Sequence, residues 1–483
     1  MAEATIRLCK HVVANHFGST VEAVSTALVK LGRLPLPMIV KSTGLSPKRV
    51  REALVVLILH GLVTHANATE ANGRIITHYS ARQREILRRT RIGLYMKLAK
   101  DNLDECVRAA LGFDIVKTTL LSGALTAKQL RQKMGITGRQ KQRSEKFQRA
   151  LMELVRERYL TALTPKDTIT EVDKILREEI EAKKSEKFPL SDKQMQEIRR
   201  SITARRYEEY NNNVIVGMKR KVVSESKSEH DLMMGFDDGP SKVHIGGDSQ
   251  DEVEEDVYFR VNFDRLDVLL RNQQIAAYIK TKINTGASLV MGHILKLTEA
   301  KTKSCLEHTS SPITANQIVH SIPKDLPLSE TMVLDADGPA GRESRLVEYA
   351  HAYIELIHSD NSGILVKRDE RGSGEYVVDF EHAFQTLRDK QVDMFVQEKL
   401  GSVCARIMRV LRKMGKLDEN QIAQLSMISV GMCRSCLHEM FGLGLIDLHE
   451  VPRSADKAPK RVIYLWHVDY NKQLQAMLNL AYT

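Results

Sequence analysis

Residues 36–63 read LPMIVKSTGLSPKRVREALVVLILHGLV, and this stretch decides the fold. Apolar side chains recur at helical spacing over 36–43 and again over 47–59, with the turn Gly44-Leu45-Ser46 between them. The Ser-Pro pair after the turn is a good start for the second helix. His60-Gly61-Leu62-Val63 ends that helix and leads into a strand pair. Two helices around a tight turn, followed by a hairpin, predict a winged helix.

The same unit recurs four times along the chain, and a repeat of this kind sets the architecture. We therefore expect a mainly α fold with small β-hairpins (α+β), built as a tandem repeat of four extended winged-helix domains. The expected parts are winged helix 1 at 1–80, a basic connector and winged helix 2 at 81–164, a charged and largely disordered linker at 165–256, winged helix 3 at 257–382, winged helix 4 at 383–470, and the start of a C-terminal helix at 471–483. The linker prediction rests on the abundance of Ser, Gly and Asp and the scarcity of apolar residues over 224–256. The four winged-helix parts are called the first to fourth modules below.

Apolar periodicity places further helices and strands within the later modules. In the first module, strand 62–66 should pair with 74–79. In the second, we expect helices over 103–121, 127–134 and 142–156. In the third, we expect helices over 259–270, 274–304, 314–322 and 345–358, and strands at 364–366 and 376–378. In the fourth, we expect helices near 384–414, 419–425 and 430–441, with a hairpin pairing 445–451 and 461–468.

Composition limits the class of partner and the compartment. The 72 Lys and Arg residues against 61 Asp and Glu give a net charge of +11, which favours an anionic partner, with nucleic acid ahead of a membrane surface. Six cysteines in 483 residues do not suggest a disulfide framework, so we expect a reducing compartment. The N-terminus lacks the layout of a signal peptide, and no apolar run approaches the roughly 20 residues that span a bilayer. We therefore expect a soluble intracellular protein with no membrane partner.

Exposed cations on the second helix of a module are the candidates for DNA contact, because a winged helix places that helix in the major groove. The DNA-binding candidates in the first and second modules are Lys48, Arg49, Arg51, Arg139, Lys141, Arg143 and Lys146. Contact with phosphates requires only cations on one exposed face, and both helices supply them. A solvated charged face, or a winged helix used for protein contact, is the alternative for either module.

Two other segments are candidates for protein contact. The connector after the first module alternates cations with apolar residues, and its candidates are Arg88, Arg91 and Tyr95. The helix over 430–441 carries a single Lys or Arg and is otherwise mostly apolar or neutral, which is typical of a protein-facing surface. Its candidates are Arg434, Leu437 and Phe441.

No pattern for catalysis, cofactor binding or metal binding survives inspection. The cluster Cys433-x-x-Cys436-x-His438 lies within a helical pattern and has no second CxxC to complete a tetrahedral zinc site. Asp335-Ala336-Asp337-Gly338 resembles part of a calcium loop, but the last loop position is Leu346, where a bidentate Glu is needed. The sequence contains none of the phosphate-binding, dinucleotide-binding, zinc-protease or serine-hydrolase motifs. We expect no enzyme activity, no cofactor and no small-molecule substrate.

Several motifs in the third and fourth modules resemble one known family. They are YFRVNFDR at 258–265, GEYVV at 374–378, and the hairpin segments EVP at 450–452, DKAPKR at 456–461 and YLW at 464–466. They are similar to the large winged-helix subunit of the RNA polymerase III-specific heterotrimer, which is related to the alpha subunit of TFIIE. The resemblance covers nearly the whole chain and leaves about 165–256 unmatched.

The resemblance implies a non-catalytic subunit of DNA-directed RNA polymerase III in the nucleus. Its implied partners are the polymerase III core, the two smaller heterotrimer subunits, TFIIIB and promoter DNA. The implied role is docking on promoter-bound TFIIIB and DNA opening, for transcription of tRNA, 5S ribosomal RNA and other small RNAs. The family normally ends in a long coiled-coil hairpin, so either this sequence is truncated at 479–483 or this member lacks that element. The alternative function is a free winged-helix DNA-binding transcription regulator.

Overall fold

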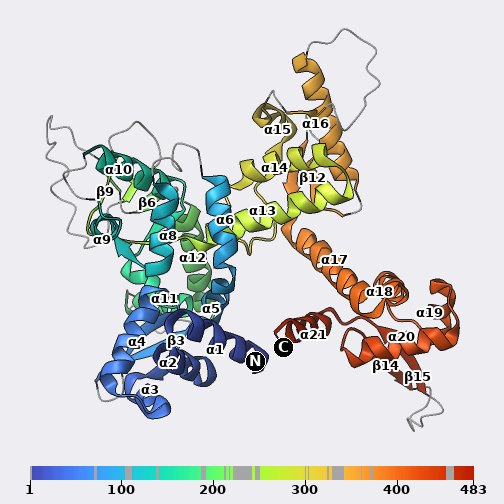
Figure 1. The fold of residues 1–483 in the computed structure, drawn as a ribbon, viewed down its shortest axis with the longest axis horizontal. Coiled ribbons are helices and arrows are strands. Elements are labelled where there is room, and N and C mark those ends of the chain that lie inside the picture. Colours follow the sequence, from blue (N-terminus) through green and yellow to red (C-terminus); the bar gives the residue numbers. More distant parts are fainter. Residues whose placement is uncertain are drawn as a thin grey trace. The chain divides into compact units, whose positions relative to one another are not determined.

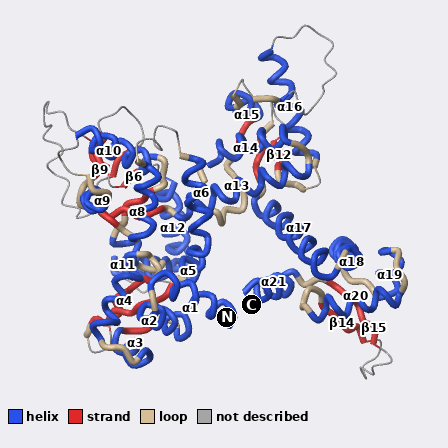
Figure 2. The backbone as a smooth tube through the Cα atoms, in the orientation of Figure 1, coloured by secondary structure: helices blue, strands red, loops and turns tan. Residues whose placement is uncertain are grey.

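Helices make up most of the protein, and its strands form small antiparallel sheets (Figures 1 and 2). The computed structural model describes residues 3–69, 73–103, 111–136, 141–185, 192–211, 214–216, 218–220, 242–244, 251–299, 301–302, 304–323, 326–328, 342–360, 362–369, 374–452 and 462–482. The chain divides into two compact units, an N-terminal unit made mainly of Ile6–Arg271 and a C-terminal unit made mainly of Asn272–Thr302 and Leu306–Thr483. Across the described ranges, no helix is both long and apolar enough to cross a bilayer.

The first module follows its local sequence signals closely. Its elements are α1 (Glu3–Phe17), α2 (Ser19–Leu31), β1 (Leu34–Pro35), α3 (Leu36–Thr43), α4 (Pro47–Leu59), β2 (Val63–Thr69) and β3 (Ile75–Ala81). The predicted helices over 36–43 and 47–59 are confirmed to the residue. Gly44, at φ +68°, ends α3 in the left-handed conformation that glycine adopts without strain. The sheet has the order β1-β3-β2, and Val13, Val24 and Leu57 are buried beneath it in one apolar core.

The second module completes its sheet with a strand that comes from far along the chain. Its elements are α5 (Gln83–Arg88), the 3-10 turn η1 (Arg89–Arg91), α6 (Ile92–Asn102), α8 (Gly112–Ser122), β4 (Leu125–Thr126), α9 (Ala127–Lys133), α10 (Lys141–Arg156), β5 (Leu160–Ala162) and β10 (Tyr258–Val261). The sheet order is β4-β10-β5, with Phe259 opposite both Leu125 and Ala162. The predicted third-module helix over 259–270 is wrong in its first residues, because the strand ends at Val261, and is confirmed from Phe263 onward, where α13 starts.

Several helices and strands lie within 165–256, where a largely disordered linker is predicted. They are η2 (Pro165–Thr168), α11 (Glu171–Ser185), α12 (Asp192–Asn211), and two short strand pairs, β6 (Val214–Val216) with β8 (Lys242–His244) and β7 (Met218–Arg220) with β9 (Asp251–Val253). Arg199 donates from Nε to the buried carboxylate of Glu179 at 2.7 Å and ties α12 to α11. The disorder prediction is wrong for these elements. Residues 221–241 and 245–250 lie outside the described part of the chain.

The third module occupies the first half of the C-terminal unit. Its elements are the end of α13 (Phe263–Lys282), α14 (Thr285–Glu299), β11 (Ile313–Thr314), α15 (Ala315–Ser321), α16 (Arg342–Ser359), β12 (Leu365–Asp369) and β13 (Glu375–Val378). The predicted single helix over 274–304 is wrong, because Asn284 interrupts it. The Asn284 side chain accepts a hydrogen bond from the Ala287 amide at 2.8 Å and caps the new helix α14. The two predicted strands are confirmed, and the sheet order is β11-β13-β12.

The fourth module begins with a helix pair. Its elements are α17 (Phe380–Leu400), α18 (Ser402–Met414), α19 (Glu419–Ser426), α20 (Val430–Gly442), β14 (Asp447–Pro452), β15 (Val462–His467) and α21 (Tyr470–Tyr482). Gly401, at φ +90°, divides the predicted 384–414 segment into two helices. Arg412 on α18 ties them together through Asp389 at 3.5 Å and Asp393 at 2.9 Å on α17. The predicted hairpin is confirmed, with Leu448 opposite Trp466.

Candidate nucleic-acid interface

Helix α4 presents three cations to solvent because its other face is fixed in the core. Val50, Ala53, Leu54 and Leu57 recur at i, i+3, i+4 and i+7 and are all buried. The DNA-binding candidates of this module are all exposed: Lys48, Arg49 and Arg51. All three lie in the first turn and a half of the helix, the part that contacts base edges and phosphates in helix-turn-helix proteins.

Helix α10 has the same division of faces. Phe147, Ala150, Leu151, Leu154 and Val155 are buried. Its candidates Lys141, Arg143 and Lys146 are exposed, and Arg149 extends the line of cations at the spacing i, i+3, i+6. Arg139 lies outside the described residues.

The cations of α4 and α10 keep their charge available for a ligand. None of the six described candidates forms an ion pair with another described residue. Since guanidinium and ammonium groups without a carboxylate partner bind phosphate without first breaking an internal contact, both helices suit a polyanion.

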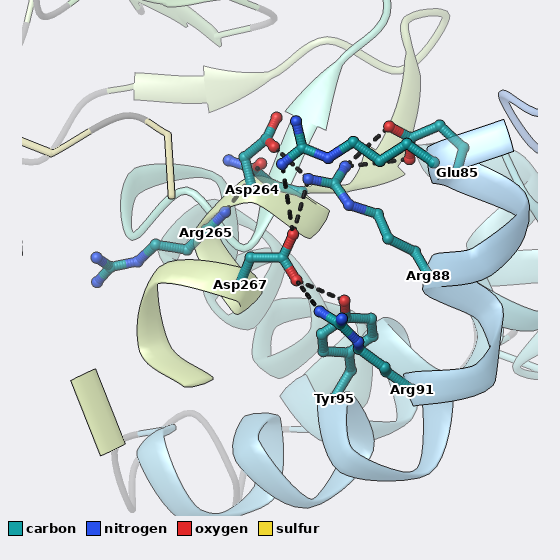
Figure 3. Close-up of polar contacts among 9 residues, drawn as sticks. Glu85, Arg88, Arg91, Tyr95, Asp264, Arg265 and Asp267 are labelled. Atoms are coloured by element: carbon teal, nitrogen blue, oxygen red, sulfur yellow. Dashed lines mark hydrogen bonds and ion pairs between the residues drawn. The ribbon is translucent and has the colours of Figure 1, made fainter. Parts of the chain in front are cut away.

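The connector candidates take part in a partly buried ionic cluster that holds α5 and α6 to the start of α13 (Figure 3). Arg88 donates to Asp264 at 2.5 Å and lies 2.8 Å from Asp267, and it also pairs with Glu85 at 2.9 Å. The Tyr95 hydroxyl donates to Asp267 at 2.6 Å. Burial alone would lower the pKa of Arg88, but the three carboxylates outweigh it and raise that pKa. Burial and then the hydrogen bond to Asp267 raise the pKa of Tyr95.

This cluster corrects the assignment of two connector residues to partner contact. Arg88 is 6% exposed and Tyr95 is 0% exposed, so neither side chain is available to a second protein. Arg91 is different, because its side chain is 54% exposed and only approaches Asp267, at 3.8 Å. The alternation of Arg with Leu and Tyr in the connector therefore reflects contacts inside the N-terminal unit. Of the three connector candidates, Arg91 alone is exposed enough to contact a partner.

The candidates on α20 are divided in the same way. Leu437 is fully buried in the core of the fourth module, which corrects its assignment to a partner surface. Phe441 is 45% exposed and its ring packs edge-on against Trp466, with centroids 5.8 Å apart. Arg434 is exposed but pairs with Glu419 at 2.9 Å, so this helix offers no uncompensated cation to DNA.

The two cysteines of the declined metal cluster belong to this core. Cys433 and Cys436 are buried on α20, and burial raises the pKa of the Cys433 thiol to about 11. A thiol that remains protonated at neutral pH packs as a small apolar side chain.

A second buried polar group joins the first and second modules, and none of its residues was a predicted site residue. Arg89 is 7% exposed, lies over the Phe17 ring at 4.6 Å, and donates from Nη2 to His60 Nδ1 at 2.6 Å. Burial and then the charge of Arg89 lower the pKa of His60 to about 3. His60 is therefore neutral and acts as a hydrogen-bond acceptor. The HGLV motif provided a partial signal, because it placed a histidine at the end of α4.

Family models and known proteins match this chain over most of its length. Family models match at residues 7–68 (RNA polymerase III subunit RPC82 helix-turn-helix domain), 149–387 (RNA polymerase III subunit RPC82) and 392–468 (POLR3C, C-terminal winged-helix domain). The chain is 24% identical to DNA-directed RNA polymerase III subunit RPC3 of Bos taurus and of Homo sapiens, over 100% of this chain and 83% and 82% of those proteins. It is 25% identical to DNA-directed RNA polymerase III subunit rpc3 of Emericella nidulans, over 98% of this chain and 87% of that protein.

The three family models match the N-terminal, central and C-terminal parts of the chain, and all three describe the same RNA polymerase III subunit. The helix-turn-helix model covers α3 and α4, and the C-terminal winged-helix model covers α18 to β15. The predicted resemblance is thereby confirmed, but the expectation that it leaves about 165–256 unmatched is wrong, because one family model spans 149–387. The chain belongs to the RPC3/RPC82 family of RNA polymerase III subunits, with helix-turn-helix and winged-helix domains.

Proposed function

We propose that this chain is a non-catalytic, nuclear subunit of RNA polymerase III that acts with the two smaller heterotrimer subunits. In this proposal the heterotrimer docks the polymerase core on promoter-bound TFIIIB and helps to open the DNA for synthesis of tRNA, 5S ribosomal RNA and other small RNAs. All four modules are winged helices, and α4 and α10 lie against promoter DNA. Family membership supports the polymerase assignment.

The exposed cations of α4 and α10 are the observation that carries the DNA contact. Each helix is anchored by a buried apolar face and presents at least three cations that have no carboxylate partner among the described residues. In contrast, α20 exposes Val430, Met432 and Phe441, and its cation Arg434 is neutralised. The fourth module therefore suits a protein neighbour better than a phosphate backbone.

The salt dependence of DNA binding tests this division. The two test variants are Lys48→Ala/Arg49→Ala and Arg143→Ala/Lys146→Ala, and Lys413→Ala/Lys416→Ala is the control with the same change in charge on exposed residues of the fourth module. Binding of a labelled duplex is measured by fluorescence anisotropy over a series of salt concentrations. Each test variant should make the negative slope of log K against log salt shallower by about 2, equally for different DNA sequences, and the control should keep the wild-type slope. If both test variants also keep the wild-type slope, neither helix contacts the DNA phosphates.

Affinity purification tests the polymerase assignment separately. Tagged chain is recovered from nuclear extract at moderate salt, and its companions are identified. Recovery with the polymerase III core in near-equal amounts supports a subunit. Recovery alone, or with chromatin only, contradicts it and favours a free DNA-binding regulator.

A further inference from the structure

The junction between the first and second modules contains a partly open cavity of about 260 Å³. Its walls are mainly aliphatic, with Ile58, Leu59 and Val63 from the first module and Ala124 and Leu163 from the second. Tyr258, which is 44% exposed, lines it from the first position of β10. All of these residues belong to the N-terminal unit.

Two arginines, the carboxylate of Asp167 and three threonines (Thr64, Thr164 and Thr168) also line the cavity. Arg82 precedes α5, and Arg260 lies on β10 opposite Thr161. Neither forms an ion pair with another residue of the described ranges. Burial, and next the charge of Arg82, lower the pKa of Arg260, so two partly desolvated guanidinium groups share one small space.

The three carboxylates whose charges act on Arg260 are Glu85, Asp167 and Asp264, and each already has another partner. Glu85 and Asp264 pair with Arg88, and Asp167 accepts hydrogen bonds from the Thr164 amide at 2.8 Å and the Thr164 hydroxyl at 2.7 Å. The cavity therefore carries positive charge that the surrounding residues compensate only in part. An incoming carboxylate would gain charge-assisted hydrogen bonds without displacing one of these acids.

The walls of the cavity are held by close backbone contacts. The Arg260 guanidinium lies against Gly61, where any Cβ would collide with it, and Gly61 has φ +69°. A Cβ at Gly123 would lie 2.9 Å from the Leu59 carbonyl oxygen, so the two modules touch there without a side chain between them. A site with such fixed walls is preformed, which lowers the entropic cost of binding.

Size and chemistry restrict the occupant. The volume is below the roughly 300–1,000 Å³ typical of cofactor and small-molecule sites, and it matches a single bulky side chain better. Away from the two arginines the lining is mainly apolar, so most of the polar edge of a nucleobase would lack hydrogen-bond partners there. The arginines favour carboxylates next to the buried group.

We propose that this cavity holds an acidic peptide segment of a protein partner, with one bulky apolar side chain inserted between the modules and flanking carboxylates on Arg82 and Arg260. This proposal rests on the proposed function, in which the chain is part of an assembly, and adds the place where a partner protein would bind. It does not depend on the DNA contacts of α4 and α10.

Site-specific photocrosslinking of the full chain in cells tests the proposal. Tyr258 is replaced by p-benzoylphenylalanine, the cells are irradiated, and the tagged chain is purified and its crosslinked peptides are identified by mass spectrometry. The expected product joins the cavity to a segment of another protein in which acidic residues flank a bulky apolar residue. The Arg82→Gln/Arg260→Gln variant should reduce this product by at least about fivefold, which corresponds to about 1 kcal/mol.

Controls separate the cavity from folding and from the polymerase assignment. Lys413→Gln/Lys416→Gln removes the same charge from the fourth module and should leave the crosslink intact, and circular dichroism confirms that each variant is folded. The proposal would be overturned by the absence of a crosslink, or by a crosslink only to nucleic acid or within the chain. It would also be overturned if the Arg82→Gln/Arg260→Gln variant gave the same crosslink yield as the wild type. Co-purification of the polymerase core is scored separately, so core recovered without the crosslink rejects only the cavity. A crosslink to an acidic segment of another protein, without co-purification of the polymerase core, supports the cavity and rejects the subunit assignment.

Discussion

Truncation of Asp267 to alanine should destabilise the N-terminal unit more than truncation of Glu85 or Asp264, the other two carboxylates that contact Arg88 in Figure 3. The Asp267 carboxylate is 6% exposed, accepts the Tyr95 hydroxyl and lies 2.8 Å from Arg88. Asp267→Ala leaves the buried Tyr95 hydroxyl without its acceptor, which costs about 1–3 kcal/mol. Removing the partner of a buried charge costs about 3–5 kcal/mol, but Arg88 keeps Glu85 and Asp264, so its share is smaller. We expect a total loss of about 3–4 kcal/mol.

The matched control is Asp264→Ala. Asp264 contacts the same guanidinium, but its side chain is 42% exposed, so we expect a loss of about 1 kcal/mol or less. Both variants remove one carboxylate from Arg88, so the difference between them measures the burial of Asp267 together with its hydrogen bond from Tyr95.

Thermal unfolding followed by two probes measures the effect. Far-UV circular dichroism reports all helices, whereas Trp466, the only tryptophan of the sequence, reports the fourth module. For a unit of this size, Asp267→Ala should lower the midpoint of the N-terminal transition by about 6–12 °C. The Trp466 transition should not move. If Asp267→Ala lowers the free energy of unfolding no more than Asp264→Ala, the contacts of Asp267 with Arg88 and Tyr95 do not stabilise the packing of the connector on α13.

Three further changes test other parts of the structure. Gly123→Ala should cost about 1–3 kcal/mol more than Gly135→Ala in urea unfolding, because both glycines have positive φ but only a Cβ at Gly123 meets the Leu59 carbonyl; equal losses would mean that the two modules do not touch there. His60 has a folded-state pKa of about 3, below its unfolded value, so its contribution to stability is complete above about pH 6.5 and is lost as pH falls, by about 2 kcal/mol at pH 5. His60→Gln keeps an acceptor for Arg89 but does not titrate, and the difference between urea midpoints at pH 7 and pH 5 should shrink by that amount; an unchanged difference would exclude His60 as its source. Leu437→Asp should abolish the Trp466 unfolding transition, whereas Phe441→Asp, at a half-exposed position of the same helix, should shift it only modestly; similar effects of the two would contradict the burial of Leu437.

The sequence by itself determined the elements whose signals are local. Helix α4 starts and ends where the Ser-Pro pair and the HGLV motif predict, and the buried and exposed faces of α4 and α10 follow from apolar spacing. Thr314 caps α15 through a capping box that is visible in the sequence as Thr and Gln three residues apart. Helix starts, stops and faces depend on residues within a few turns of one another, so the DNA-binding candidates Lys48 and Arg143 were correctly predicted to be exposed.

Only the tertiary structure decided what pairs over long distances. Strand β10 joins β4 and β5 across the whole linker, and four residues cannot show by themselves which sheet they complete. In the sequence, Arg88 and Tyr95 resemble surface residues of a basic connector. In the structure, Asp267 of α13 contacts both side chains, which makes their burial favourable. The charge of a buried side chain is stable only beside its partner, and that partner is brought there by packing of the whole unit rather than by neighbouring sequence.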